Sequence, residues 1–163
     1  MPGRRAGRMK VKISSQLAIF ALLELAREPD RQLSVGEIGE KYGASSHHLA
    51  KVMNVLGRAR LVRAARGAGG GYQFSANSRR TTLLDVIELF EDAESALLDA
   101  GDSTAEGDAL RQVLLEIDDI ARATLGSITL ATMLNLVDRA ARNASRRPAG
   151  SPQRGARRIR CSR

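Results

Sequence analysis

The most informative segment of the chain reads Leu61-Val62-Arg63-Ala64-Ala65 and continues as Arg66-Gly67-Ala68-Gly69-Gly70-Gly71-Tyr72. A short apolar run containing a β-branched residue meets a glycine-dense turn that carries one arginine, and a second run, Tyr72-Gln73-Phe74, follows the turn. Glycine accepts the backbone conformations of tight turns without steric cost. The pattern therefore predicts a two-stranded hairpin whose tip can press its backbone against a partner.

A helix-turn-helix pattern lies just before this hairpin, from Ser34 to Ala59. Ser34-Val35-Gly36-Glu37 is a capping box that opens a short helix, Gly43 ends that helix, and Ser45 can cap the next one. The connection is only a few residues long, as a DNA-binding motif of this kind requires. The expected fold class is mainly α: a winged helix-turn-helix with a small two-stranded β wing and a long C-terminal dimerisation helix.

The helix that follows Ser45 has two different faces. Apolar residues recur at helical spacing and predict a buried stripe: Leu49, Val52, Met53 and Leu56. The opposite face carries cations, an amide and an imidazole: His47, Lys51, Asn54 and Arg58. These side chains suit insertion into the major groove of DNA. An exposed helix with incidental charges is the alternative, and the absence of any acid from Ser45 to Arg80 favours the DNA-binding interpretation.

Further helices are expected on both sides of this unit. Ser14 or Ser15 can cap a first helix that runs to about Arg27. Thr81 or Thr82 can cap a fourth helix through Phe90, and the acidic residues 91–105 read as a loop.

A long apolar helix is expected after this loop. The sequence Ser103-Thr104-Ala105-Glu106 has the form of a second capping box. Gly126 is expected to break the long helix, and Ser127 to cap a last one. The apolar positions of the long helix keep helical spacing: Leu110, Val113, Leu114, Ile117, Ile120 and Ala121. A domain of this size cannot cover so long a stripe, so these residues are expected to form a dimer interface. Packing against the first helix of the same chain remains open as an alternative.

Charge is segregated along the chain, whose net charge is +8. Residues 45–80 contain seven lysines and arginines and no acid, whereas residues 81–120 contain twelve acids and Arg111 as their only arginine or lysine. This pattern points to one surface that binds a polyanion and another that faces away from it. The chain divides into a basic disordered arm at 1–12, a DNA-binding domain at 13–80, a helical dimerisation and sensing region at 81–141, and an arginine-rich disordered tail at 142–163.

Several function classes are not supported by the sequence. No transmembrane segment or signal peptide is apparent, so we expect a cytoplasmic protein with no membrane partner. No nucleophile motif, phosphate-binding loop or paired acids suggest an enzyme. His47 and His48 point about 100° apart on a helix, without a visible third ligand, so no metal site is predicted. Cys161 is the only cysteine, among arginines that favour thiol reactivity, but in a segment expected to be disordered.

Taken together, these residues resemble the Rrf-two-type repressors. The resemblance runs from about Met9 to Leu136 and rests on Leu17-Ala18-Ile19-Phe20-Ala21-Leu22, Gly43-Ala44-Ser45, the glycine-rich hairpin and Leu84-Asp85-Val86-Ile87. It implies a dimer whose long helices, here near 104–125, cross, with recognition helices in successive major grooves and wing arginines in the minor groove. The wheel analysis and the resemblance together give the candidate DNA contacts: Ser46, His47, Ala50, Lys51, Asn54, Arg58, Arg66, Gly67 and Tyr72.

Three departures from the resemblance matter. Sensing relatives carry three cysteines in the loop that corresponds to 91–106, where this chain has none, so no iron–sulfur cluster or other cofactor is predicted. Arg60 stands where relatives commonly have a glycine, and Phe20 where an arginine is frequent. The regulatory signal would then be a partner protein, or a small molecule in a pocket between the winged domain and the long helix, lined by Phe20, Ile87, Phe90 and Leu97. Loss of sensing altogether is a third alternative.

The sequence thus predicts a sequence-specific DNA-binding transcriptional regulator: a homodimeric repressor of a two-fold-related site in double-stranded DNA. The alternative from another class is an interaction scaffold whose basic tail docks on RNA or on a partner protein.

Overall fold

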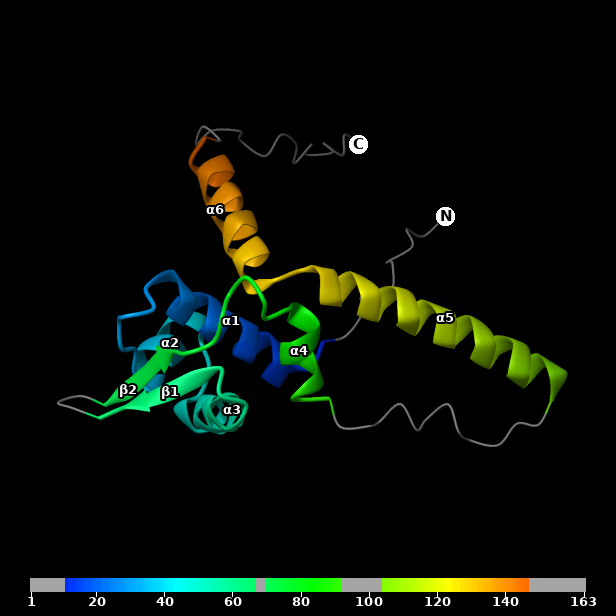
Figure 1. Ribbon diagram of the computed structural model, residues 1–163, viewed down its shortest axis with the longest axis horizontal. Helices are drawn as coiled ribbons and strands as arrows, with labels where there is room; N and C mark the ends of the chain where they lie inside the picture. The colour runs from blue at the N-terminus through cyan, green and yellow to red at the C-terminus, as the bar shows by residue number, and fades with distance from the viewer. Residues whose placement is uncertain (1–10, 67–69, 92–103, 147–163) are drawn as a thin grey trace, which may run out of the picture.

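The structure is a computed structural model that describes residues 11–66, 70–91 and 104–146. Within these residues, six helices and one hairpin follow each other (Figure 1): α1 (Ile13–Arg27), α2 (Val35–Tyr42), α3 (Ser46–Arg58), β1 (Val62–Ala65), β2 (Gly71–Phe74), α4 (Leu83–Glu88), α5 (Ala105–Ser127) and α6 (Leu130–Arg146). The predicted class, a mainly helical winged helix with one two-stranded sheet and a long C-terminal helix, is confirmed. Among the helices of the described residues, none is both long and apolar enough to cross a bilayer.

The start of α1 differs from the prediction. Lys12 is the N-cap, its side chain makes no capping bond, and both serines lie inside the helix. Ser14 instead places its Oγ 3.0 Å from Nε2 of His48 on α3, and Ser15 is buried. Neither serine caps the helix, because Ser14 contacts His48 on another helix and Ser15 is buried.

The helix-turn-helix is formed as predicted. Ser34 and Glu37 make the reciprocal bonds of a capping box at the start of α2. Gly43 ends the helix in the left-handed conformation with φ 63°, which glycine adopts freely. Ser45 caps α3 by accepting a hydrogen bond from the backbone N–H of His48 at 3.2 Å.

The hairpin is antiparallel and pairs Val62 with Phe74 and Ala65 with Gly71. It is also tied to the segment between α1 and α2: the N–H of Leu33 donates to the carbonyl of Tyr72 at 3.1 Å, and the N–H of Tyr72 donates to the carbonyl of Leu33 at 2.9 Å. The wing is thus fixed to the rest of the domain, because the backbone of Leu33 forms hydrogen bonds with strand β2.

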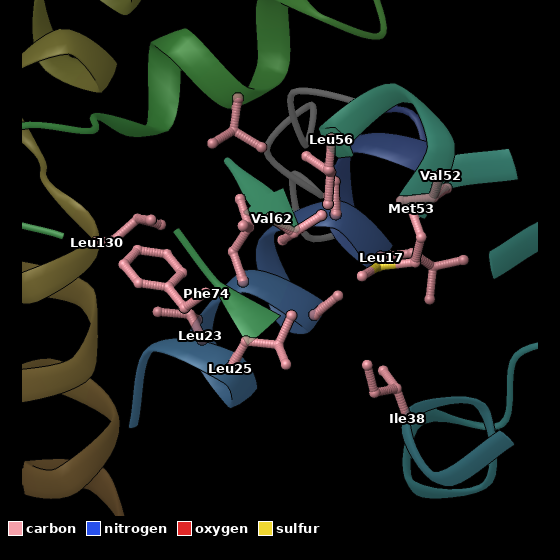
Figure 2. Packing of buried hydrophobic residues seen from close by; sticks show 14 of the residues in the cluster. Leu17, Leu23, Leu25, Ile38, Val52, Met53, Leu56, Val62, Phe74 and Leu130 are labelled. Carbon is pink, nitrogen blue, oxygen red and sulfur yellow. The ribbon is translucent and has the colours of Figure 1, made fainter. Parts of the chain in front are cut away.

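One hydrophobic core joins α1, the helix-turn-helix, the hairpin, α4 and the start of α6. Figure 2 shows leucines of α1 converging with Met53 and Leu56 of α3, with Val62 and Phe74 of the strands, and with Leu130 of α6. Full burial of one side chain of this size contributes about 1.5–3 kcal/mol to the free energy of folding. The core therefore fixes α3 and the hairpin relative to each other.

The C-terminal helices begin and end differently from the sequence-based expectation. Thr82 caps α4 in a capping box with Asp85, but the helix ends at Glu88 and Phe90 lies in the turn that follows. Thr104 caps α5 by accepting from the N–H of Gly107 at 3.1 Å. The predicted N-cap, Ser103, is therefore wrong by one position. No capping box forms with Thr104, because Gly107 at the third helical position has no side chain to return the bond.

Gly126 does not break the long helix, and Ser127 does not cap the next. Helix α5 continues through Ser127, and Thr129 accepts from the N–H of Thr132 at 3.1 Å at the start of α6. The N–H of Leu83 donates to the carbonyl of Ile128, and the N–H of Leu130 to that of Thr81. These bonds to the segment before α4 fix the boundary. At its other end α6 reaches Arg146, past the boundary predicted at 142.

Candidate nucleic-acid interface

Helix α3 presents an exposed polar face on the side opposite its buried stripe. All its predicted contact residues are exposed, and the apolar stripe behind them is fully buried. The exposed set is Ser46, His47, Ala50, Lys51, Asn54 and Arg58. Because the stripe locks the rotation of the helix, these side chains are held outward together.

His48 has a different role from its neighbour. It is half-buried, and its Nε2 lies 3.0 Å from Oγ of Ser14, so it ties the first turn of α3 to the start of α1. The described residues contain no group of three or more His, Cys, Asp or Glu side chains that could hold a metal ion. The histidine pair is thus split between an outward and an inward position.

The wing residues fall into three situations. Arg66 is exposed directly after β1, as contact with the minor groove of DNA requires. Tyr72 is half-buried in β2, where its backbone bonds to Leu33. Gly67 lies outside the described residues.

A groove of about 500 Å³ separates the C-terminal part of α3 from the hairpin. Its walls carry Asn54, Arg58 and Tyr72, which the sequence identified, and also Arg60 and Arg63, which it did not. Arg63 was hidden because it alternates with Val62 in a four-residue strand that reads as structural. Arg60 follows the helix by two residues and belongs to neither regular element.

The interface is strongly positive. Within the described residues, no carboxylate forms an ion pair with Arg58, Arg60, Arg63 or Arg66. Two arginines elsewhere are paired: Arg27 lies 3.2 Å from Asp138, and Arg122 pairs with Glu88. Four guanidinium groups without a carboxylate partner among the described residues are thus gathered on α3, the turn after it and the hairpin, as expected for a surface that binds a polyanion.

A second polar cluster lies between α1 and α2. The carboxylate of Glu24 accepts from Nζ of Lys41 at 2.6 Å and from the hydroxyl of Tyr42 at 3.0 Å. Burial alone would raise the pKa of Glu24, but these hydrogen bonds outweigh it and hold the pKa below its usual range. Burial and the bond to Glu24 raise the pKa of Tyr42 to about 12. The cluster fastens α2, and through it the helix-turn-helix, to α1.

The three residues of the predicted effector pocket that the structure describes lie in different surroundings. Phe20 stacks on Tyr42 with ring centroids 5.1 Å apart, on the α2 side of α1. Ile87 is buried in the core, and Phe90 lines a hollow with His47 and Lys51 instead. Leu97 lies outside the described residues. Aromatic stacking on α2, which the sequence pattern did not reveal, explains the position of Phe20.

Helix α5 projects from the winged-helix core as an arm (Figure 1) and has no buried residue. Four of the predicted interface residues are exposed: Leu110 by 60%, Val113 by 51%, Ile117 by 56% and Ile120 by 67%. The other two, Leu114 and Ala121, are half-buried. Packing within the chain therefore leaves most of the predicted stripe in contact with solvent.

Known proteins with similar sequence and fold agree with this architecture. The model of the Rrf2 family, described as an iron-dependent transcriptional regulator, matches residues 11–136. BadM of Rhodopseudomonas palustris, an HTH-type transcriptional regulator by its name, is 46% identical over 147 residues, or 90% of this chain and 94% of that protein. The structure of IscR from T. potens has a TM-score of 0.68 at 28% identity, over 82% of this chain and 91% of that one. CymR of Staphylococcus aureus has a TM-score of 0.66 at 25% identity, covering 76% and 96%.

An iron–sulfur cluster held by cysteines does not fit the residues of this chain. Iron–sulfur clusters are held by several cysteine thiolates, and Cys161 is the only cysteine in the sequence. The family match itself covers the helix-turn-helix, the wing and the long helix. The chain therefore belongs to the Rrf2 family and is a winged-helix, DNA-binding transcriptional regulator.

Proposed function

We propose that this protein is a homodimeric repressor that binds a two-fold-related site in duplex DNA without using an iron–sulfur cluster. One observation carries the proposal: the exposed, acid-free face of α3 lies beside a basic hairpin. Helices that read DNA place such a face in the major groove.

Base readout falls to the outward residues of α3. His47 and Lys51 can donate to guanine edges or phosphates, and Ala50 can contact a thymine methyl group. Ser46, Asn54, Arg58 and Tyr72 complete the contact surface. Arg66, with Gly67 next to it at the wing, suits a narrow minor groove, whose negative potential attracts arginine.

The long helix supplies the dimer. Leu110, Val113, Ile117 and Ile120 are more than half exposed on one helix, and water contact with so many large apolar side chains is unfavourable. Pairing with the same helix of a second copy buries them and relates two recognition helices by a two-fold axis. The matching site is then a pair of half-sites related in the same way.

The regulatory input follows from what the chain lacks. With one cysteine, at position 161, the signal is a small molecule or a partner protein rather than a cluster. We assign the protein no catalytic role and place it in the cytoplasm, where its DNA target lies.

Footprinting on the promoter beside its own gene tests the proposal. We expect protection of two half-sites in successive major grooves, lost when the half-sites are scrambled, and lower reporter expression when the protein is present. Absence of protection, together with binding to RNA or to a protein through the basic tail, would support the scaffold alternative instead.

A further inference from the structure

The groove between α3 and the hairpin is lined by two arginines, Arg60 and Arg63, that are not among the proposed DNA contacts. We propose that this groove clamps the sugar–phosphate backbone of duplex DNA and that Arg60 is its anchor. The proposal rests on the proposed function, since it assumes that α3 and the wing bind DNA.

The backbone at Arg60 is held in an unusual conformation. Its φ is 60°, and it is the one residue other than glycine with positive φ in the described part of the chain. The N–H of Arg60 donates to the carbonyl of Gly57, and the N–H of Leu61 donates to that of Leu56, both at 3.0 Å. This is the Schellman ending of a helix, in which the residue after the C-cap must be left-handed.

Glycine is the residue that this position favours. The chain does use glycine at the end of α2, where Gly43 has φ 63°. At the end of α3 the same conformation carries an arginine, whose Cβ makes it strained. Strain that persists at one residue points to a function for its side chain.

The surroundings hold the backbone of Arg60 and the side chain of Arg63 in place. The hydroxyl of Ser75 donates to the carbonyl of Arg60 at 2.9 Å, so the hairpin fixes the turn. Nε of Arg63 donates to Oε1 of Gln73 at 3.1 Å, and Nε2 of Gln73 donates to the carbonyl of Asp30 at 2.8 Å. The guanidinium of Arg63 is therefore oriented before a ligand arrives.

The phosphate backbone is the ligand that fits the groove. In duplex DNA, one sugar–phosphate strand separates the major groove from the neighbouring minor groove. A protein that places α3 in the first and Arg66 in the second must straddle that strand with the surface between them. Here this surface is the groove lined by Arg58, Arg60 and Arg63, which have no carboxylate partner among the described residues. Guanidinium groups bind phosphate oxygens through paired hydrogen bonds.

The decisive variant is Arg60→Gly, because it separates stability from binding. Removing the strained Cβ should raise the urea midpoint of unfolding. Removing the guanidinium should lower affinity about three- to tenfold for operator and scrambled duplex alike, and reduce the slope of log K against log salt by about one per half-site. Fluorescence anisotropy over a salt series, with full-length protein and labelled 30-base-pair duplexes, measures both quantities.

Two further variants complete the experiment. Arg60→Lys keeps the charge and should keep the salt slope. Arg139→Ala removes an exposed arginine from α6, which packs on α1 and not in the groove, and should leave the slope unchanged. Arg60→Gly with wild-type affinity and slope overturns the clamp while leaving the proposed function intact. Loss of affinity for the operator only, with the slope unchanged, also overturns it, because Arg60 would then read bases. If wild-type protein binds neither duplex, it is the proposed function that fails.

Discussion

Lys51 and Arg66 are two of the residues that we propose for base recognition. Both are exposed, one on α3 and one at the wing. We expect Lys51→Ala and Arg66→Ala each to weaken operator binding by about 1–3 kcal/mol, with a much smaller effect on scrambled duplex, because a good base contact is worth that much discrimination. Anisotropy titrations with both duplexes measure this. Equal losses on the two duplexes would show that these side chains contact phosphates only.

Glu24 makes folding stability depend on acid. Its pKa is lowered in the folded state, so its stabilising contribution is full above the ordinary value of 4.5 and is lost as pH falls through the folded pKa. Glu24→Gln should cost about 0.5–1 kcal/mol near neutral pH, and this difference from wild type should shrink as the pH falls below the ordinary value of 4.5. Urea unfolding at several pH values measures it. Glu40→Gln, at an exposed position of α2, is the control; a difference independent of pH would contradict the prediction.

At the scale of elements, the hairpin depends on a close approach of two backbones. A Cβ added at Gly71 would lie 2.8 Å from the carbonyl oxygen of Leu33. Gly71→Ala should therefore destabilise the fold by about 1–3 kcal/mol, since backbone cannot move aside as a flexible side chain can. Gly57→Ala on α3 is the matched control: its Cβ would meet nothing within 4 Å, and helix stability should rise by about 0.5–1 kcal/mol. Thermal unfolding separates the two, and a neutral Gly71→Ala would mean that the wing is not held by Leu33.

Elements whose signals are local could be predicted from the sequence. The capping box at Ser34, the cap at Ser45 and the buried stripe of α3 depend on neighbours within one or two turns, and all are present. The start of α6 depends on bonds between Thr81 and Leu130 and between Leu83 and Ile128. Those pairs are far apart in sequence, so no local pattern could have indicated Thr129 rather than Ser127.

The candidate site shows the same division. Helical periodicity was sufficient to identify the outward face of α3. Arg60 and Arg63 join the site only because the hairpin folds back beside the end of α3. Phe20 was misplaced for a related reason: its partner Tyr42 is on another helix. Contacts between elements are what the sequence alone does not display.

At the scale of the whole molecule, α5 should determine the oligomeric state. Ile117 is 56% exposed, and burial of one such side chain contributes about 1.5–3 kcal/mol, twice in a two-fold interface. Ile117→Asp should therefore convert a dimer into a monomer at micromolar concentration. Sedimentation velocity measures this, with Asp118→Asn as the neighbouring control. Monomeric wild-type protein at micromolar concentration would refute the dimer.

The purified protein should be colourless. Because Cys161 is the only cysteine, anaerobic reconstitution with iron and sulfide should leave no stable visible chromophore, and chelators, nitric oxide or oxygen should not change DNA affinity through a cluster. Absorption spectra before and after desalting measure this. A chromophore that survives Cys161→Ser would mean that oxygen or nitrogen ligands hold a cluster.

The bare arm formed by α5 also has a consequence for the cell. If a regulator binds DNA only as a dimer, the concentration of that dimer varies with the square of the free monomer concentration. This holds whenever the monomer concentration lies below the dissociation constant of the dimer. Halving the copy number then reduces the active species about fourfold. Synthesis, proteolysis and cell division, which all change the copy number, thereby also change the activity of the promoter. A repressor that binds beside its own gene would keep its copy number close to the value at which repression of that gene ends.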